Sequence, residues 1–325
     1  MKKKELTIII PTFNRSNSLI SILQSLSEQN SKEYRINVII CDSYSKDDSE
    51  KNVKLFSENN QNLDIKYLNI DANILAAKRN FGIKNSSSRF NILIDDDCIP
   101  DNNFIKDYIE SLEVMDEKTI LSGIVLYPKQ HILNSNYLKF KSNTHFKKID
   151  TSNNTIEPNH MVAMNMAFLI SDDLLKTKLF DEGFIGYGFE DYEFAYRLKE
   201  VNFKLKQTKA TIIHDEGTPR FDKYLKKYFH LGRDGMKNLL KINYMAALDT
   251  IYYKLESNIL YKLFSKIPKI SLLLRILENI IIKIDKVKLI YLPFFYNVAR
   301  FSSYMRGYIE RNKKSLNLQN NNWYE

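Results

Sequence analysis

The decisive stretch of this sequence is Asn91-Ile92-Leu93-Ile94-Asp95-Asp96-Asp97-Cys98-Ile99-Pro100, an apolar run that ends in three adjacent carboxylates. Like charges so close repel one another, which raises the pKa of at least one carboxyl group unless a cation holds it. Carboxylate oxygens are hard ligands that suit Mg²⁺ or Mn²⁺, and these ions usually share their coordination sphere with substrate phosphates. Because α/β sheets bind ligands at the carboxyl ends of their strands, the stretch predicts a metal and diphosphate site rather than an ordinary acidic loop.

Short apolar runs alternate with helical patterns before this stretch. The apolar runs are residues 6–10, 36–40 and 65–68, and the helical patterns are residues 16–26, 47–57 and 75–84. Ser16 or Asn17 is placed to cap the first helix, whose apolar residues follow the i, i+3, i+4, i+7 spacing. The apolar runs have no polar face, as strands of a buried parallel sheet require. With a further strand expected at residues 120–127, the alternation predicts an α/β fold with a doubly wound, mostly parallel, Rossmann-like sheet.

The pattern changes near residue 220, where the sequence becomes almost wholly helical. Residues 221–325 hold 19 basic and 8 acidic residues, whereas residues 1–220 hold 29 basic and 31 acidic residues. We therefore predict one domain at residues 1–220 and a basic, mainly helical region at residues 221–325. Concentrated positive charge indicates an anionic partner. We expect that partner to be a glycan, a lipid-linked molecule or a membrane surface, and not a nucleic acid.

The two cysteines, Cys41 and Cys98, are too few for a disulfide framework, and the apolar run that stops at Pro11 is too short for a signal peptide. No stretch approaches the roughly 20 apolar residues that cross a bilayer. We expect a reducing, cytoplasmic location. Peripheral attachment at the inner face of the cell membrane is the alternative left open.

Two common phosphate-binding loops are missing from the sequence. The turn after the first strand reads Pro11-Thr12-Phe13-Asn14-Arg15, without the Gly-x-Gly-x-x-Gly of dinucleotide sites, and no Walker loop occurs. With nine glycines in 325 residues, a backbone cradle for phosphate is not expected. A diphosphate must therefore be held by metal and by cationic side chains.

Candidate nucleotide-binding residues follow the second strand and lie on the helix before the acidic stretch. Asp42 is placed to accept hydrogen bonds from a nucleoside, although it could instead satisfy amides of its own loop or cap the next helix. Lys78 and Arg79 could complete the neutralisation of a diphosphate. For both, the alternative is a solvated helix face, and it weighs more for Lys78 than for Arg79.

A glycine-rich segment, residues 180–193, carries the second strong feature. Three of the nine glycines lie there, so the backbone must bend sharply or approach a ligand. The bend ends in Glu190-Asp191, directly before a helical pattern. A carboxylate there can serve as general base for a hydroxyl nucleophile, and helix capping is the alternative. We favour the base.

His214 ends the apolar run at residues 210–213, so it follows a strand as the aspartates do. A lone histidine is more often structural than a metal ligand. Neutral imidazole can nevertheless complete the coordination of Mn²⁺, and this placement makes His214 a candidate.

In this order, the motifs resemble the family 2 glycosyltransferases of the GT-A fold over roughly residues 5–216. The later part also resembles the galactosyltransferase-like module of chondroitin-polymerase-type enzymes. The segments that carry the resemblance are Thr7 to Arg15, Asp42 with Ser45 and Asp47, Lys78 to Gly82, Asp95 to Asp97, Asn165 to Ala167, and Gly186 to Asp191 with His214. One departure is Tyr44, which stands where the family often has a turn glycine and leaves the identity of the base open.

The resemblance implies a role for each candidate residue. Pro11, Thr12 and Asp42 would hold the nucleoside, usually uridine, and Asp95 would face the ribose beside Asp96. Asp97, the last residue of the Asp-x-Asp motif, and His214 would bind Mn²⁺ or Mg²⁺. Asp191, with Glu190 next to it, would be the catalytic base, and Arg79 would contact the donor.

The function expected from these features is metal-dependent, inverting transfer of a hexosyl or N-acetylhexosaminyl group from a UDP-sugar to an acceptor hydroxyl. The expected setting is synthesis of a bacterial surface polysaccharide, such as a capsule, or of a glycoconjugate. A nucleotidyltransferase acting on sugar phosphates could use the same carboxylates, but it would not need the Glu190-Asp191 bend. The third possibility is a polyanion- or membrane-binding protein with a degenerate transferase domain, which the full set of carboxylates disfavours.

The basic region combines cations with apolar residues at helical spacing. Its cations are Lys262, Lys266, Lys269, Arg275, Lys283, Lys286 and Lys288, and its apolar residues are Leu260, Leu263, Phe264, Ile267, Leu272, Leu273, Ile276, Leu277 and Ile280. This composition is typical of amphipathic helices on anionic membranes. A helical cap on the catalytic domain would have the same composition, and the sequence leaves both open.

Overall fold

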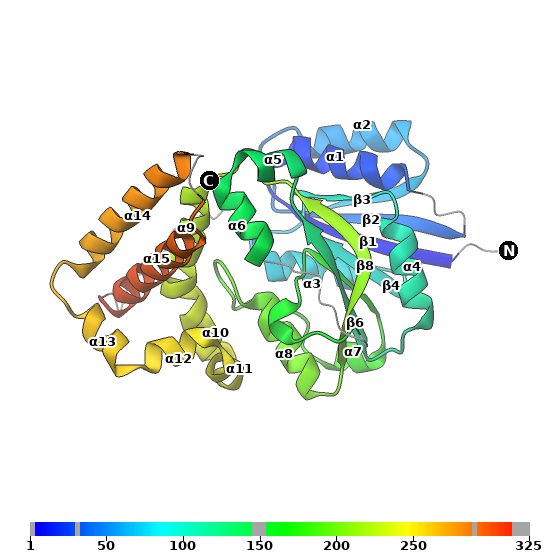
Figure 1. Cartoon of the computed structure of the whole chain (residues 1–325). Helices are drawn as coiled ribbons and strands as arrows, with labels where there is room; N and C mark the ends of the chain where they lie inside the picture. The colour runs from blue at the N-terminus through cyan, green and yellow to red at the C-terminus, as the bar shows by residue number, and fades with distance from the viewer. Residues whose placement is uncertain (1–3, 30–32, 145–153, 288–290, 314–325) are drawn as a thin grey trace. The chain divides into compact units, whose positions relative to one another are not determined.

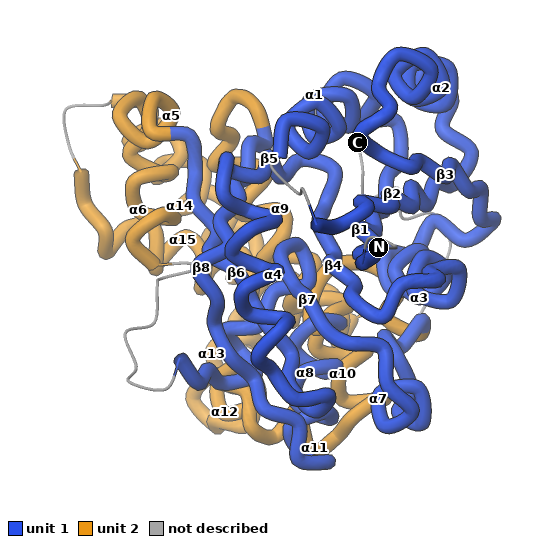
Figure 2. Tube along the Cα trace, turned by 90° about the vertical axis from the view of Figure 1, so that its right-hand side faces the viewer, with its two compact units in different colours: residues 1–128, 146–182, 190–216 blue, residues 129–145, 183–189, 217–325 orange. Residues whose placement is uncertain are grey.

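The computed structural model describes residues 4–29, 33–144, 154–287 and 291–313, with the elements labelled in Figure 1. The chain forms two compact units, coloured in Figure 2. Unit 1 comprises residues 1–128, 146–182 and 190–216, and unit 2 comprises residues 129–145, 183–189 and 217–325. The two domains divided at residue 220 stay a prediction, and the compact units are discontinuous along the chain.

Unit 1 is built on a mixed sheet of eight strands in the order β3-β2-β1-β4-β7-β6-β8-β5. The strands are β1 (Lys4–Thr12), β2 (Tyr34–Asp42), β3 (Leu63–Asn69), β4 (Phe90–Ile94), β5 (Cys98–Pro100), β6 (Thr119–Leu126), β7 (Asn165–Leu169) and β8 (Lys204–His214). The β3-β2-β1-β4 half and the β6–β8 pair are parallel, whereas β7 and β5 run antiparallel to their neighbours. The predicted mostly parallel α/β sheet is confirmed, and β7, which was not expected, joins its two parallel parts.

Helices cover both faces of this sheet. They are α1 (Ser16–Ser27), α2 (Ser49–Asn59), α3 (Leu75–Asn85), α4 (Phe104–Val114), α7 (Asp172–Lys176) and α8 (Glu190–Glu200), with a 3₁₀ turn, η1, at Pro158–His160. One apolar core takes side chains from α1, α2 and α4, and a second takes them from α3, α7 and α8. Ile8 and Ile10 of β1 enter the first core while Ile9 enters the second. The strand is therefore apolar throughout because both of its faces are buried.

The expected cap of α1 is wrong. The helix begins after Arg15, and no side chain at that position accepts a hydrogen bond from the first turn. Instead, the Ser16 amide donates to Asp47 Oδ2 at 2.9 Å. A carboxylate from the loop after β2 thus satisfies an amide that local capping would otherwise satisfy, and this contact ties the two loops together.

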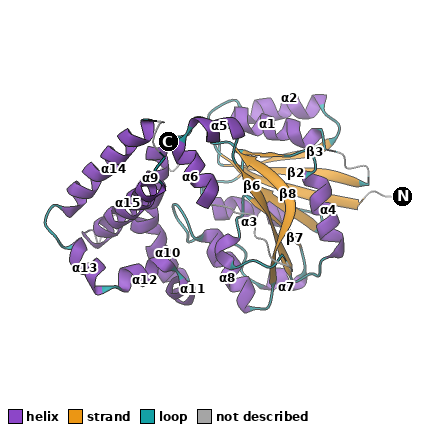
Figure 3. Ribbon diagram, viewed as in Figure 1, coloured by secondary structure: helices purple, strands orange, loops and turns teal. Residues whose placement is uncertain are grey.

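Unit 2, as far as the structure describes it, contains helices and no strand (Figure 3). They are α5 (Lys129–Asn134), α6 (Asn136–Thr144), α9 (Phe221–His230), a π-helical turn η2 (Leu231–Gly235), α10 (Met236–Ile242), α11 (Tyr244–Asp249), α12 (Ile251–Ser257), α13 (Ile259–Ser265), α14 (Ile270–Lys286) and α15 (Pro293–Lys313). The predicted helical character of this part is confirmed. None of the helices within the described ranges is both long and apolar enough to cross a membrane.

Aromatic packing explains why residues 129–145 belong to this helical unit. Tyr137 of α6 packs against Phe221 and Tyr224 of α9, with ring centroids 5.3 and 5.0 Å apart. Phe140 stacks on Tyr296 of α15 at 4.9 Å. Large rings buried in this way contribute much of the apolar area of a small core, so α6 is held by side chains far from it in sequence.

Gly82 provides a test of how closely α3 packs on the sheet. A Cβ atom at this position would lie 2.3 Å from Ile9 Cγ2 and 3.1 Å from Cys41 Sγ. We expect Gly82→Ala to lower the free energy of unfolding of unit 1 by about 1–3 kcal/mol through overpacking, although alanine is the better helix former. Urea denaturation measures the change, with exposed Asn85→Ala on the same helix as control. A neutral or stabilising Gly82→Ala would contradict the close contact.

Candidate active site

The three aspartates form a tight turn between β4 and β5. The Cys98 amide donates to the Asp95 carbonyl at 3.1 Å and closes this turn. The turn lies at the carboxyl ends of β1 and β2, where Thr12 pairs with Asp42 in the parallel register. The sheet therefore brings together the ends of β1, β2 and β4, as the sequence predicts.

Asp96 is the buried member of the three. Its Oδ2 accepts a hydrogen bond of 2.8 Å from the Thr12 hydroxyl. Burial, together with the neighbouring charge of Asp97, raises the pKa of Asp96 to about 7. Asp96 is therefore the aspartate whose pKa is raised by the expected repulsion.

Asp97 lies between Arg15 and His214. Strand β5 runs antiparallel to β8 and pairs Cys98 with His214, which places His214 Nε2 3.4 Å from Asp97 Oδ1. Arg15 Nη1 lies 3.4 Å from Asp97 Oδ2. Burial by itself would raise the pKa of Asp97, but His214 and Arg15 outweigh it and hold this pKa well below its usual range.

The side chains of Asp97, Cys98 and His214 could share a cation. Their ligand atoms all lie within 4.8 Å of one another. His214 Nδ1 is buried and has no hydrogen-bond partner among the described residues. Carboxylate and imidazole suit Mn²⁺, and carboxylate suits Mg²⁺. The residues expected to hold a divalent metal therefore have a donor set that fits one.

Arg79 is buried and joins the aspartate turn to the start of α8. Its Nη2 lies 3.0 Å from Asp95 Oδ1, and its Nη1 lies 3.2 Å from Glu190 Oε1. The guanidinium also lies over the Phe180 ring, 5.5 Å from the centroid. The alternative of a solvated helix face is wrong for Arg79, whose side chain is 3% exposed.

The solvated-face alternative is also wrong for Lys78, which is fully buried. Its ammonium donates to the Thr12 carbonyl and to Asn73 Oδ1, both at 2.7 Å. Burial lowers the pKa of Lys78 to about 8, although Asp42 and Asp96 act against this shift. The lysine therefore supports the backbone at the end of β1 from within the protein.

Asp42 is engaged by its own loop. Its carboxylate accepts from the Ser45 amide at 2.7 Å and from the Ser45 hydroxyl at 2.6 Å. This matches the alternative in which Asp42 satisfies loop amides. Since a carboxylate offers about four lone-pair sites, these two bonds leave acceptor capacity for a further donor.

The glycine-rich segment turns through left-handed backbone conformations before α8. Gly186 and Gly188 have φ angles of 102° and 97°, and Phe189 follows with a φ of 75°. Glycine adopts such conformations without steric cost, so the predicted bend is confirmed. Glu190 and Asp191 then open α8.

Asp191 is partly buried next to a second carboxylate. Burial, followed by the charge of Glu190, raises the pKa of Asp191 to about 7, while Arg79 acts in the opposite direction. A carboxyl group with a pKa near neutrality suits proton transfer at physiological pH. This environment fits a base better than it fits a simple helix cap.

Sequence reasoning assigned no role to Arg15 or Cys98, which both lie against Asp97. Arg15 had a readable signal, because it follows β1 at the same edge of the sheet as the aspartates. The proximity of Cys98 follows from the turn itself. Glu216, 3.8 Å from His214 Nε2, is a further acidic group that the sequence analysis did not select.

Comparison with known proteins identifies the family. The sequence profile described as Glycosyl transferase family 2 matches residues 7–176, about half of the chain. The chain belongs to glycosyl transferase family 2. The matched segment contains the aspartate turn, Asp42 and Arg79, whereas Glu190, Asp191 and His214 lie beyond it.

Among curated proteins, this family 2 chain is similar to polysaccharide synthases. It is 30% identical over 223 residues to chondroitin synthase of Pasteurella multocida (strain Pm70), which covers 59% of this chain and 23% of that protein. It is 27% identical over 248 residues to chondroitin synthase of Escherichia coli, covering 66% of this chain and 35% of that protein. Hyaluronan synthase of Pasteurella multocida is 28% identical over 243 residues, which cover 66% of this chain and 25% of that protein. The chain thus spans about a quarter to a third of the length of these relatives.

Solved structures of low sequence identity share the fold. A mannosyltransferase from Pyrobaculum calidifontis, in complex with GDP-Man and Mn²⁺, matches with a TM-score of 0.58 at 14% identity, over 96% of this chain and 88% of that one. S. aureus TarS 1–349 in complex with UDP-GlcNAc matches with a TM-score of 0.50 at 13% identity, over 95% of this chain and 92% of that one. These likenesses confirm the GT-A type of architecture.

The double ion pair of Arg79 predicts a large loss of stability when it is removed. Arg79→Met leaves Asp95 and Glu190 without their shared cation, and we expect the free energy of unfolding to fall by roughly 3 kcal/mol. Thermal or urea denaturation measures the loss. The matched control is Arg35→Met, because Arg35 pairs with Asp64 at the surface and such pairs contribute about 0–1 kcal/mol. Equal effects of the two substitutions would contradict a structural role for the buried pair.

Proposed function

We propose that this protein transfers a sugar from a nucleotide-diphospho-sugar, a UDP-sugar, to an acceptor hydroxyl with inversion at the anomeric carbon. The observation that carries the proposal is the network through Arg79. It links the aspartate turn, which suits a metal-bound diphosphate, to Glu190 and Asp191, which suit proton abstraction. A family 2 chain with both halves of this arrangement has the groups needed for a single displacement.

The donor is proposed to lie along the carboxyl edge of the sheet. Pro11, Thr12 and Asp42 would hold the nucleoside, and Asp95 and Asp96 would face the ribose. Thr12 and Asp42 are adjacent in register at the ends of β1 and β2, which supports a shared contact. The UDP-GlcNAc complex of S. aureus TarS 1–349 supports a uridine donor, and an N-acetylhexosamine or hexose is the sugar we propose.

Asp97 and His214 are the residues proposed to hold Mn²⁺ or Mg²⁺. A divalent ion there would stabilise negative charge on the leaving diphosphate, an electrostatic effect that is commonly the largest in such reactions. The Mn²⁺ named with the Pyrobaculum calidifontis mannosyltransferase, which shares the fold, supports this choice. Arg79 would act by positioning Asp95 and Glu190 beside the donor.

Asp191 is the proposed base, with Glu190 as its neighbour. The acceptor hydroxyl would lose its proton to a carboxylate oxygen of Asp191 while the oxygen attacks the anomeric carbon. The sugar–phosphate bond breaks as the new glycosidic bond forms, and the electron pair leaves with the diphosphate. Glu190 raises the pKa of Asp191, which makes its carboxylate a stronger proton acceptor near neutral pH.

We further propose a glycan or lipid-linked acceptor and a role in synthesis of a bacterial surface polysaccharide or glycoconjugate. The similarity to chondroitin and hyaluronan synthases supports this setting. A cytoplasmic location accords with Cys41 and Cys98, which are both free and buried.

A screen of donor hydrolysis tests the proposal directly. The full chain is incubated with UDP-linked and GDP-linked sugars in the presence of Mn²⁺, Mg²⁺ or a chelator, and release of the nucleoside diphosphate is measured. We expect turnover of a UDP-sugar that the chelator stops. Release of inorganic pyrophosphate from a nucleoside triphosphate and a sugar phosphate, without any release of UDP, would instead identify a nucleotidyltransferase.

Asp97→Ala should abolish metal-dependent binding of UDP. The substitution removes a proposed ligand but also relieves repulsion with Asp96, so the fold should persist. Calorimetry with UDP and Mn²⁺ measures the binding, and circular dichroism monitors the fold. Asp173→Ala, which removes an exposed carboxylate of α7, is the control and should bind normally. Unchanged affinity in Asp97→Ala would eliminate Asp97 as a metal ligand.

Asp191→Asn should reduce kcat by roughly 10²–10⁴-fold, because asparagine keeps the shape and hydrogen bonding but cannot accept the proton. Donor affinity should stay nearly constant in calorimetry. A large loss of donor affinity would mean that Asp191 binds the donor or caps α8. Another residue would then have to be the base.

The pH dependence separates Asp191 from other groups. A base with a pKa of about 7 must be ionised, so kcat/KM should fall below about pH 7 as Asp191 takes up a proton. Glu190→Gln removes a charge that raises this pKa, and the acidic limb should therefore move to lower pH. A limb that does not move would assign it to another group, such as Asp96, whose pKa is also about 7.

A further inference from the structure

An uncovered row of apolar side chains follows α13. Leu260, Leu263 and Phe264 of α13, with Ile267 just after the helix, follow the i, i+3, i+4, i+7 spacing and are 36–71% exposed. Tyr261, on another face of the helix, is buried and belongs to the core of unit 2. The exposed row is thus additional to the side chains that attach α13 to that core.

Helix α14 repeats the arrangement. Its Ile270, Leu274 and Ile281 are buried, and α14 packs on α15, which contacts α9 and η2 in turn (Figure 1). A second apolar row, Leu273, Ile276, Leu277 and Ile280, has the same spacing as the row of α13 and is 37–55% exposed. Monomeric proteins seldom leave apolar rows of this length uncovered.

Basic side chains flank both apolar rows. Lys262, Lys266 and Lys269 accompany the row of α13, and Arg275, Lys283 and Lys286 accompany the row of α14; all six are exposed. Lys288, the last cation of this predicted series, lies outside the described residues. Together, the two apolar rows and these six cations define what we call the α13–α14 face.

The acidic side chains of α14 are engaged with α15, and α13 has no acidic residue. Glu278 is buried, where it accepts a hydrogen bond of 2.8 Å from the Ser302 hydroxyl and pairs with Arg306 of α15. Asp285 accepts from the Tyr296 hydroxyl at 2.7 Å. Each carboxylate is therefore engaged with α15, and the exposed charge of the two helices is positive.

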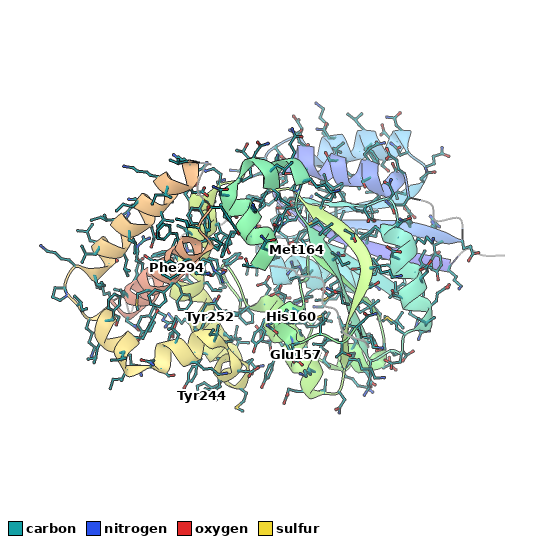
Figure 4. All side chains as sticks on the ribbon, viewed as in Figure 1. Glu157, His160, Met164, Tyr244, Tyr252 and Phe294 are labelled. Carbon is teal, nitrogen blue, oxygen red and sulfur yellow. The ribbon has the colours of Figure 1, made fainter. Side chains whose placement is uncertain are left out.

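The α13 side of the face is hollowed. Leu260, Leu263, Phe264 and Ile267 form one wall of an open apolar hollow of about 620 Å³, and Phe301 and Met305 of α15 form another. Phe294, labelled in Figure 4, lies outside this hollow and is a separate aromatic ring, 70% exposed, at the start of α15. An open apolar hollow beside cations suits a partner with flexible hydrocarbon chains and negatively charged head groups.

We propose that the α13–α14 face docks on an anionic lipid bilayer. Amphipathic helices with a basic flank rest in the interface with their apolar rows among the acyl chains, while each nearby lysine or arginine is attracted to anionic head groups. A second copy of this chain would bring one set of six cations against another, and like charges oppose that association. The lipid contact is separate from the proposed sugar transfer and does not depend on it.

Cosedimentation of the full chain with lipid vesicles tests the proposal. Binding to phosphatidylcholine vesicles should rise as phosphatidylglycerol is added and fall as salt is raised. Replacing Lys262, Lys266 and Lys283 by glutamine should weaken partitioning on the order of 100-fold. Replacing Leu263, Ile276 and Ile280 by serine should weaken it on the order of tenfold or more. All six positions are exposed, so both variants should melt like the parent in circular dichroism.

The matched control replaces Lys51, Lys54 and Lys106 by glutamine. These lysines are exposed on α2 and α4, so the control changes the net charge equally but leaves the α13–α14 face intact, and it should bind as the parent does. Donor hydrolysis without lipid should be the same in all variants, which keeps this test apart from that of the proposed activity.

Several results would overturn the proposal. Protein that stays in the supernatant at every lipid composition would exclude docking of the α13–α14 face on lipid. Equal weakening by the control, or normal binding by the serine variant, would indicate a general electrostatic contact of the kind that any polyanion makes. A lipid-free dimer that the serine variant converts to a monomer would assign the face to a second copy of the chain.

Discussion

The site depends on one buried guanidinium. Arg79 projects from α3 and holds Asp95, at the end of β4, and Glu190, at the start of α8, through two ion pairs. Carboxylates crowded at one edge of a sheet repel one another, and burial strengthens the repulsion. A fixed planar cation with two donor edges can satisfy both groups at once, which a lysine could not do with the same geometry. Arg79 thereby contacts a carboxylate that lies 111 positions further along the sequence.

Three further side chains lie beside the ends of β1 and β4. Lys78 binds the Thr12 carbonyl from within the protein, and Arg15 and His214 lie against Asp97. As a result, adjacent aspartates differ strongly: the pKa of Asp97 is held low, whereas the pKa of Asp96 is raised to about 7. Neighbouring carboxyl groups with opposite pKa shifts are typical of functional sites. Here the shifts differ because Asp97 faces His214 and Arg15, whereas Asp96 is buried beside the charge of Asp97.

The helical unit is stabilised differently from the sheet. Its core combines aromatic rings with aliphatic side chains. Buried acidic groups are paired with α15, as Glu278 is with Arg306. Helices α13 and α14 use one apolar stripe to join this core and keep a second stripe exposed beside lysines. A helix of a small unit needs only one apolar stripe to pack on its core. The exposed second stripe is therefore available for contact with a partner.

The sequence by itself determined the parallel half of the sheet, the helical character of the last hundred residues, the position of the aspartate turn and the bend before Glu190. Each of these is encoded locally, in apolar runs, helical spacing, adjacent charges and glycines. Only the tertiary structure decided that β7 enters antiparallel, that β8 pairs with β5 and so brings His214 to Asp97, and that Lys78 and Arg79 are buried. Strand pairing and burial depend on contacts between distant segments, and a periodic pattern carries no information about which distant segment it will meet. The cap expected at Ser16 failed for the same reason, because the partner of that amide, Asp47, comes from another loop.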